Sequence, residues 1–270
     1  MLISPEQLTQ FHEEGYFILE GVMNRDQLQG LRDETDRYIS IIHDEMDKSG
    51  TDVIGLNHRG SRYFVYNRHQ DSPILTDFLY SDLMYEVCKT TLGDNAYLFH
   101  EQYVIKAAEK GMKFAWHQDS GYVGHEHKAY LTCWCPLDDV SEENGTIYVL
   151  PYSRAGTREI VKHVQEAGTN DLIGYTGNDP GIPVICPAGS VVAFSSKLFH
   201  RSGFNRTSKM RRVYLPQYSP EVIMNAEGTK PWAFAEPFIQ RETASNTLNR
   251  FPFKLSILHE WLESNFGKAQ

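Results

Sequence analysis

Apolar residues recur at helical spacing through the first third of the chain, and polar capping residues mark where helices begin. Ser4 stands three residues before Gln7, a pattern that favours a helix start, and Gly15 favours the end of that helix. Asn24 or Asp26 is expected to cap the second helix. The pattern predicts helices at about 4–15, 25–46 and 72–92, a short strand at 16–19, and a polar, glycine-bearing loop at 49–62.

Alternating apolar and polar positions, which are typical of strands, replace the helical spacing from Ala96 onward. Asn144-Gly145 is a hairpin-turn signal. The polar segment 154–179 predicts an insertion over the strands. Strands are predicted at about 97–106, 114–120, 130–136, 146–150, 183–187, 191–194 and 211–218, and a last helix at 253–266.

These elements predict a mainly β fold with flanking helices. No stretch has the composition of a linker, so we expect one domain over residues 1–270. Its parts would be a helical N-terminal part at about 4–93, a barrel at about 96–218, and a C-terminal helical extension.

Composition and the start of the chain limit the binding partners and the cell compartment that we expect. The net charge of −9 argues against a nucleic-acid surface, and no run of 18 apolar residues would span a membrane. The start of the chain does not resemble a signal peptide, and Cys133-x-Cys135 lacks the spacing of a redox or zinc motif. We therefore expect a cytoplasmic protein with free thiols, a monomer or homodimer whose partner is a small-molecule substrate.

One short motif suggests metal chemistry. His117 and Asp119 lie two residues apart in a predicted strand, so their side chains share a face. An imidazole and a carboxylate are two of the three ligands in the facial triad of non-haem Fe(II) oxygenases, and His200 is the candidate third ligand. Three ligands leave three positions open for a bidentate co-substrate and dioxygen. The alternative is a surface histidine beside a solvated aspartate, because His-x-Asp arises often by chance.

The residues after His200 favour a metal site over that alternative. Gly203 and Asn205 favour a turn, so we expect Arg211 on the next strand of a hairpin. A guanidinium beside a metal suits a dicarboxylate that chelates with one end and offers its other carboxylate to a bidentate clamp. 2-Oxoglutarate is such a molecule. Arg212 is the rival clamp, since neighbours in a strand face opposite ways.

Taken together, the motifs resemble the phytanoyl-CoA dioxygenase family of Fe(II)/2-oxoglutarate-dependent oxygenases. The resemblance runs from about residue 8 to about 218, and it implies a double-stranded β-helix, a jelly-roll or cupin-like barrel. It is carried by His117-x-Asp119, His200-x-Ser202-x-x-Asn205, Arg211, Ile105-Lys106, the segment 139–153 and the approach 187–194 before the distal histidine.

The resemblance implies roles for individual residues. His117, Asp119 and His200 would bind Fe(II). Arg211 and the hydroxyl of Ser202 would hold the far carboxylate of 2-oxoglutarate. Trp134 would pack against that co-substrate, although a tryptophan of the core is the alternative. Because Asp119 is retained, the implied reaction with dioxygen is hydroxylation, not halogenation, with release of succinate and carbon dioxide.

Two departures concern the loops near the site. Tyr152 and Arg154 stand where relatives have Gly and His, and Ala107 stands in place of a proline. Substrate contacts known in relatives therefore do not transfer to this chain.

Substrate contacts are instead predicted from position. His100 and Gln102 share a strand face, and they would contact substrate if that face looks into the barrel; an outward polar face is the alternative. Arg59 and Arg62 lie in a loop that could cover the pocket as a lid, or be solvated. These polar candidates favour a small polar or anionic metabolite, while an apolar natural product stays open.

Two other functions remain compatible with the same residues. One is a cupin-type metalloenzyme that does not use 2-oxoglutarate and needs no Arg211 clamp. The other is a non-catalytic metal-binding barrel. Succinate release coupled to substrate turnover separates both from the oxygenase.

Overall fold

The computed structural model describes residues 2–108, 113–166 and 172–241, and Met1–Ile239 form one compact unit. The helix predicted at 253–266, and with it the C-terminal extension, lies outside the described residues.

The N-terminal helices begin at predicted caps. Ser4 and Asn24 each form a capping box, with Gln7 and Gln27 at the third helical position. The prediction of one helix over 72–92 is wrong, because Ser81 caps a second helix there. The helices are α1 (Pro5–Glu14), α2 (Arg25–Ser49), α3 (Pro73–Leu79), α4 (Asp82–Leu92) and α5 (Tyr152–Ala155), with 3-10 turns η1 (His69–Asp71) and η2 (Asp119–Tyr122).

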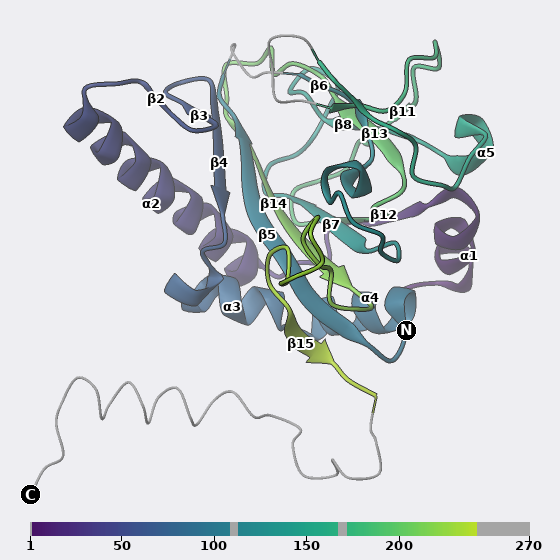
Figure 1. The fold of residues 1–270 in the computed structure, drawn as a ribbon. Coiled ribbons are helices and arrows are strands. Elements are labelled where there is room, and N and C mark those ends of the chain that lie inside the picture. Colours follow the sequence, from purple (N-terminus) through teal and green to yellow (C-terminus); the bar gives the residue numbers. More distant parts are fainter. Residues whose placement is uncertain (1, 109–112, 167–171, 242–270) are drawn as a thin grey trace, which may run out of the picture. The chain divides into compact units, whose positions relative to one another are not determined.

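Most strands belong to two antiparallel sheets (Figure 1). The large sheet has the order β1-β12-β7-β14-β5-β4-β3-β2, with β15 also paired to β5, and the small sheet has the order β11-β8-β13-β6. The large sheet comprises β1 (Tyr16–Leu19), β2 (Val53–Ile54), β3 (Asn57–His58), β4 (Arg62–Tyr66), β5 (Ala96–Lys106), β7 (Leu131–Pro136), β12 (Val191–Ser195), β14 (Arg211–Ser219) and β15 (Glu236–Ile239). The small sheet comprises β6 (Phe114–His117), β8 (Ile147–Leu150), β11 (Ile182–Pro183) and β13 (Phe199–Ser202), and β9 (Val164–Gln165) pairs with β10 (Leu172–Ile173).

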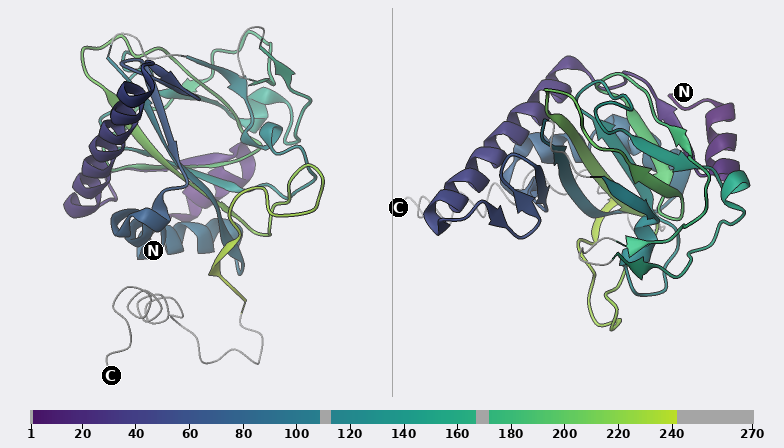
Figure 2. Two further views of the ribbon diagram at one scale, coloured as in Figure 1. Left: turned by 60° about the vertical axis from the view of Figure 1, so that its left-hand side comes forward. Right: turned by 90° about the horizontal axis from the view of Figure 1, so that it is seen from above.

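Two hydrophobic clusters hold these layers together. The inner cluster joins the sheets, since it contains Trp134 and Phe194 from the large sheet and Val149 from the small one. The outer cluster lies between the large sheet and α2, α3 and α4, which cover its outer face (Figure 2). The arrangement is the expected double-stranded β-helix with flanking helices.

Two predicted connections differ from the structure. The turn at Asn144-Gly145 forms, and Gly145 has φ +78°, but it links strands of opposite sheets. The segment after His200 likewise crosses from β13 in the small sheet to β14 in the large one, so Arg211 does not lie on a hairpin partner. Both are consequences of winding two sheets together, which local turn signals do not encode.

Two contacts identify the face of β5 that points into the barrel. Lys106 donates from Nζ to Ser202 Oγ on the small sheet, at 2.7 Å, and Val104 packs in the inner cluster. His100 and Gln102 share this face by alternation, so the outward-face alternative is wrong. The predicted loop at 49–62 instead contains β2 and β3, which extend the large sheet.

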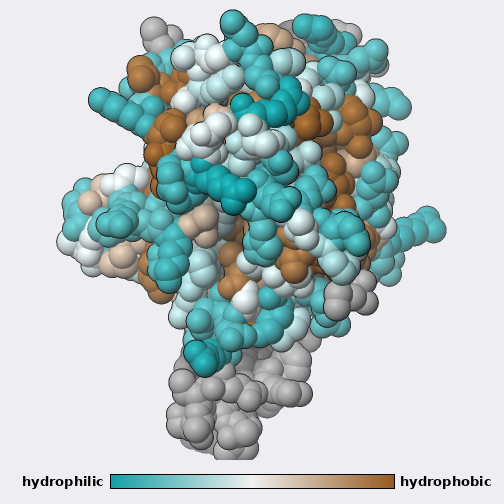
Figure 3. Space-filling view, turned by 90° about the vertical axis from the view of Figure 1, so that its right-hand side faces the viewer, coloured by the Kyte–Doolittle hydropathy of each residue, from teal (hydrophilic) through white to brown (hydrophobic). Residues whose placement is uncertain are grey.

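The insertion 154–179 approaches the small sheet, because Gly174 N donates to Trp116 O on β6 at 2.8 Å. On the face of the molecule that Figure 3 presents, hydrophobic residues form separate patches within a mostly hydrophilic surface. In the part of the chain that the structure describes, no helix has the length and apolar character needed to cross a membrane. All four cysteines are buried free thiols, as predicted.

Candidate functional site

The three predicted metal ligands come together between the sheets. β13 and β6 are antiparallel neighbours whose register pairs His200 with His117. β6 ends at His117, and Asp119 begins η2, so the prediction of one strand over 114–120 is wrong beyond His117. Gln118 is nevertheless extended, with φ −113° and ψ 135°, and this keeps His117 and Asp119 on one side of the chain.

The ligand atoms of this triad have the spacing that a first-row metal requires. Asp119 Oδ1 lies 3.4 Å from His200 Nε2 and 3.8 Å from His117 Nε2, and one ligand atom from each residue lies within 4.8 Å of the other two. An ion with bonds of about 2.1 Å and right angles between them places its ligands about 3.0 Å apart. Small side-chain rotations would close the difference, so the triad could hold a metal ion.

Both imidazoles are oriented for this role. His117 Nδ1 lies 2.8 Å from Ala115 O, and His200 Nδ1 lies 3.2 Å from Leu198 O. A carbonyl accepts only, so in a neutral imidazole at either position Nδ1 carries the proton, which leaves Nε2, the nitrogen that faces Asp119, as the ligand atom.

Two residues that sequence reasoning did not assign hold the carboxylate of Asp119. Thr132 Oγ1 donates to Asp119 Oδ2 at 2.7 Å, and Gln217 Nε2 donates to the same oxygen at 3.0 Å. They lie 13 and 98 residues after Asp119, on β7 and β14, so only their inward-facing positions could have been inferred.

Two buried cations, Arg211 and Lys106, lie opposite each other on β14 and β5, beside Ser202, which follows the triad residue His200 by two positions; we call this group the cationic pocket. Arg211 is buried and donates from Nη2 to Gly145 O at 3.1 Å, but its Nε and Nη1 have no hydrogen-bond partner among the described residues. Its guanidinium lies 5.6 Å from the centre of the Trp134 ring. Two buried, unpaired N–H groups on a cation are complementary to a carboxylate.

Lys106 is a second cation in this pocket, and sequence reasoning missed its role although it placed Lys106 on the right face. Lys106 Nζ donates to Ser202 Oγ and to the carbonyls of Gly203 and Gly145. Burial, reinforced by the charge of Arg211, lowers the pKa of Lys106 well below its usual value. Burial also lowers the pKa of Arg211 to about 10, and no carboxylate forms an ion pair with either group within the described residues. The cationic pocket therefore favours the binding of an anion.

The rival Arg212 points away from this pocket. Its Nη2 lies 2.7 Å from Asp138 Oδ1, and its Nη1 lies 3.6 Å from Asp36 Oδ1 on α2. These hydrogen bonds and charges raise the pKa of Arg212. Arg211 is therefore the arginine that lies opposite Lys106 and over the Trp134 ring.

His100 and Gln102 line the inner face at the level of the triad. The register of β14 places Gln217, which contacts Asp119, directly across from His100. His100 Nδ1 is buried without a hydrogen-bond partner in the described chain, and burial lowers the pKa of His100. Tyr66 and Trp232 flank it, with ring centroids 6.4 and 5.8 Å away. This neutral imidazole between aromatic rings is available to a ligand.

The structure does not bring Arg59 to the site. Arg59 binds Asp52 through Nε at 2.7 Å and Asp47 through Nη2 at 2.5 Å, near the end of α2, so its charge is already compensated. Arg62 lies at the start of β4, paired in register with Lys106, and donates from Nε to Leu56 O at 3.1 Å. The prediction that a loop carries these arginines over the pocket as a lid therefore holds for neither of them. Only Arg62 shares the inner face of the large sheet.

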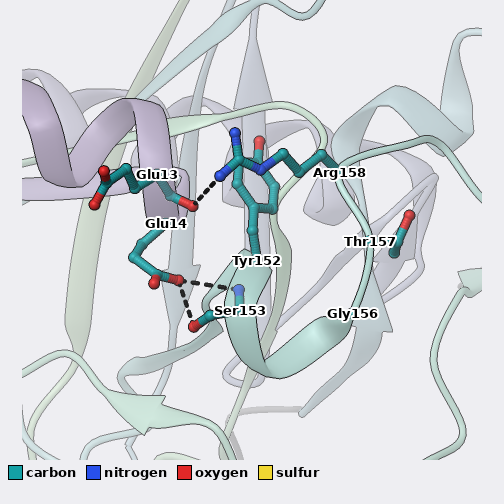
Figure 4. Close-up of a pocket in the computed structure, with 7 residues that line it drawn as sticks. All are labelled: Glu13, Glu14, Tyr152, Ser153, Gly156, Thr157 and Arg158. Atoms are coloured by element: carbon teal, nitrogen blue, oxygen red, sulfur yellow. Dashed lines mark hydrogen bonds between the residues drawn. The ribbon is translucent and has the colours of Figure 1, made fainter.

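His125, His127 and a hollow between α1 and α5 do not belong to the triad. His125 is exposed, and His127 bonds to Ser120 Oγ at 3.0 Å, so neither joins the metal group. A hollow of about 460 Å³ between α1 and α5 is lined by groups that already bond one another, such as Glu14 with Ser153 (Figure 4).

Comparisons with known proteins agree with this site. The sequence model of the phytanoyl-CoA dioxygenase family matches residues 11–213. The Arabidopsis thaliana phytanoyl-CoA dioxygenase is 23% identical, over 93% of this chain and 98% of its own, and the Mus musculus peroxisomal phytanoyl-CoA dioxygenase is 23% identical over 78% and 67%.

Solved structures share the fold. EctD from S. alaskensis, solved with 2-oxoglutarate and 5-hydroxyectoine, is 20% identical with a TM-score of 0.65, covering 89% of this chain and 88% of that one. The carbocyclase SnoK from nogalamycin biosynthesis has a TM-score of 0.63 at 17% identity, covering 87% and 93%. Since the family match spans the barrel and most of the helical part, the chain belongs to the phytanoyl-CoA dioxygenase family of Fe(II)/2-oxoglutarate-dependent oxygenases.

Proposed function

We propose that this 2-oxoglutarate-dependent dioxygenase hydroxylates an unactivated C–H bond of a small polar metabolite, with release of succinate and carbon dioxide. The observation that carries the proposal is the metal triad together with the buried guanidinium of Arg211, two of whose nitrogens have no hydrogen-bond partner among the described residues. A cupin-type enzyme without 2-oxoglutarate, or a non-catalytic barrel, has no use for that buried charge.

The cofactors are Fe(II), 2-oxoglutarate and dioxygen, and the residues fit them. His117 Nε2, Asp119 Oδ1 and His200 Nε2 would hold the metal from one side. Bound Fe(II) with 2-oxoglutarate supplies the oxidising chemistry that amino-acid side chains lack. The triad residues act as ligands rather than as general acids or bases.

The cationic pocket would orient the co-substrate. Arg211 offers Nε and Nη1 to the far carboxylate, and Lys106 and Ser202 add an ammonium and a hydroxyl beside it. The ring of Trp134 packs over the guanidinium and excludes water from the pair. An anion bound here would raise the pKa of Lys106 back toward its usual value, so its binding would favour the charged form of Lys106.

The opposite side of the metal would receive substrate. His100 Nδ1 and the amide of Gln102 supply hydrogen-bonding groups, and Tyr66 and Trp232 supply aromatic walls. A neutral imidazole and an amide suit a hydroxyl, amide or similar polar group on the substrate. Orientation of one C–H bond toward the metal would follow from these contacts.

The test is substrate-dependent succinate formation. Purified protein would be loaded anaerobically with Fe(II) and 2-oxoglutarate, mixed with a pooled metabolite library, and exposed to air. We expect some pools to raise the succinate rate above the background, and Asp119→Ala to abolish the increase. Oxidation of a metabolite without consumption of 2-oxoglutarate would instead support the cupin-type alternative, and no turnover with any pool would support the non-catalytic one.

A further inference from the structure

The two oxygens of the Asp119 carboxylate have different surroundings. Oδ1 faces His117 and His200, while Oδ2 accepts hydrogen bonds from Thr132 and Gln217. Oδ1 is therefore placed to bind a metal ion, and Oδ2 is held by the protein.

The donors on the protein side are themselves fixed. Thr132 is fully buried and Gln217 is 5% exposed, and the register of β7 and β14 places them directly across from one another. Gln217 Nε2 also donates to Thr132 Oγ1 at 3.0 Å. One amide hydrogen thus goes to Asp119 and the other to Thr132, while the single hydroxyl hydrogen of Thr132 goes to Asp119.

Only one orientation of the Gln217 amide and the Thr132 hydroxyl satisfies all three of these hydrogen bonds. If the amide of Gln217 were reversed, its carbonyl oxygen would face the carboxylate oxygen of Asp119 without a hydrogen between them. If the hydroxyl of Thr132 turned away, Oδ2 would lose its shorter bond, 2.7 Å. Since the terminal torsion of an aspartate is otherwise broad, these two residues are what determine its rotation.

We infer that Thr132 and Gln217 are positioning residues that reserve Oδ2 for the protein and make Asp119 a one-oxygen metal ligand. The inference rests on the proposed function for its consequence. An octahedral ion has six positions. With one oxygen from Asp119 the triad takes three, which leaves three for a bidentate co-substrate and dioxygen. With both oxygens bound, only two would remain.

The test measures metal binding, not turnover. Anaerobic calorimetry would give the Co(II) dissociation constant, and the visible absorption of bound Co(II) would report its coordination number. We expect Thr132→Val and Gln217→Met to raise the dissociation constant by about 10- to 100-fold, as loss of partners behind a metal ligand commonly does. We also expect each variant to change the absorption intensity.

Matched controls separate positioning from general damage. Thr132→Ser keeps the hydroxyl and should bind Co(II) as the wild type does. Thr35→Val removes another buried threonine hydroxyl, which donates to Leu31 O on α2 at 2.9 Å, and should leave the dissociation constant unchanged. If Gln217→Met does not fold, Gln217→Asn shortens the side chain yet keeps its polarity, and should still weaken binding.

Folded Thr132→Val and Gln217 variants with wild-type Co(II) affinity and absorption would overturn the inference, as would an equal loss in Thr35→Val. Failure of the proposed function has a different signature: tight Co(II) binding by the wild type, with the variants weakened as expected, but no metabolite-dependent succinate.

Discussion

Replacement of Arg211 by methionine should weaken 2-oxoglutarate binding strongly while leaving the metal-free protein at least as stable. Arg211 is 1% exposed, and two of its three guanidinium nitrogens lack partners within the described residues. Truncating one member of a buried, hydrogen-bonded charge pair costs about 2–5 kcal/mol of binding. At about 1.4 kcal/mol per tenfold, that is about 30- to 4,000-fold in the dissociation constant. Because Lys106 Nζ remains beside Ser202, we expect the lower part of that range.

The stability change should have the opposite sign. Without an anion, Arg211 is a buried charge whose direct bond is to Gly145 O, and replacement of such a charge by an apolar side chain is neutral or stabilising. Arg212→Met is the matched control. It removes the two side-chain hydrogen bonds to Asp138, so it should lower the melting temperature but leave 2-oxoglutarate affinity near the wild-type value.

Two measurements check this pair of variants: calorimetric titration of 2-oxoglutarate into the Co(II)-loaded protein without oxygen, and thermal unfolding of the metal-free protein. Wild-type affinity of Arg211→Met for 2-oxoglutarate, or an equal loss in Arg212→Met, would show that Arg211 does not bind the co-substrate. A large drop in the melting temperature of Arg211→Met would show that the guanidinium is a structural group.

Three further predictions concern other residues. Asp119→Ala should abolish substrate-dependent succinate formation without a loss of fold, which circular dichroism and the succinate assay would show together; unchanged turnover would exclude Asp119 as a ligand. His100→Phe should remove the response to substrate but leave Co(II) and 2-oxoglutarate affinities unchanged, and a loss of metal binding would contradict its assignment to the substrate side. Burial opposes protonation of His69, but the carboxylate charges of Glu101 and Glu236 and the hydrogen bond to Glu236 outweigh it and raise the pKa of His69 from 6.5 to about 9. The His69–Glu236 pair should therefore contribute stability fully below pH 6.5 and lose it as the pH rises toward 9. Denaturant unfolding should therefore show the wild type losing its advantage over Glu236→Gln across that interval, and a constant difference would count against the ion pair.

Much of the fold could be predicted because its signals are local. Ser4 and Asn24 mark helix starts through their own side chains, and the alternation along β5 and β14 follows from the strand period. The break at Ser81 was missed because the apolar spacing continues across it, and only the capping bond from Met84 N to Ser81 Oγ reveals the new helix start.

The site was predictable only where a motif carries the chemistry. His117, Asp119, His200 and Arg211 stand in recognisable spacing, and the structure brings them into one region. Thr132 and Gln217 could not be found in this way, since their role depends on a strand register that pairs residues 85 apart in sequence.

Arg59 was misplaced for a related reason. A basic residue in a polar loop looks available in sequence, but β2 and β3 fold that loop against α2, where Asp47 and Asp52 bind the guanidinium. Local composition shows the charge of a side chain, not the partner that tertiary structure supplies.

An anaerobic crystal structure of the protein with Mn(II) and 2-oxoglutarate would show whether the triad and Arg211 form one site. We expect one ion within about 2.0–2.3 Å of His117 Nε2, Asp119 Oδ1 and His200 Nε2, with the far carboxylate of 2-oxoglutarate on Arg211. An ion bound elsewhere, or a carboxylate that leaves Arg211 unpaired, would contradict this expectation.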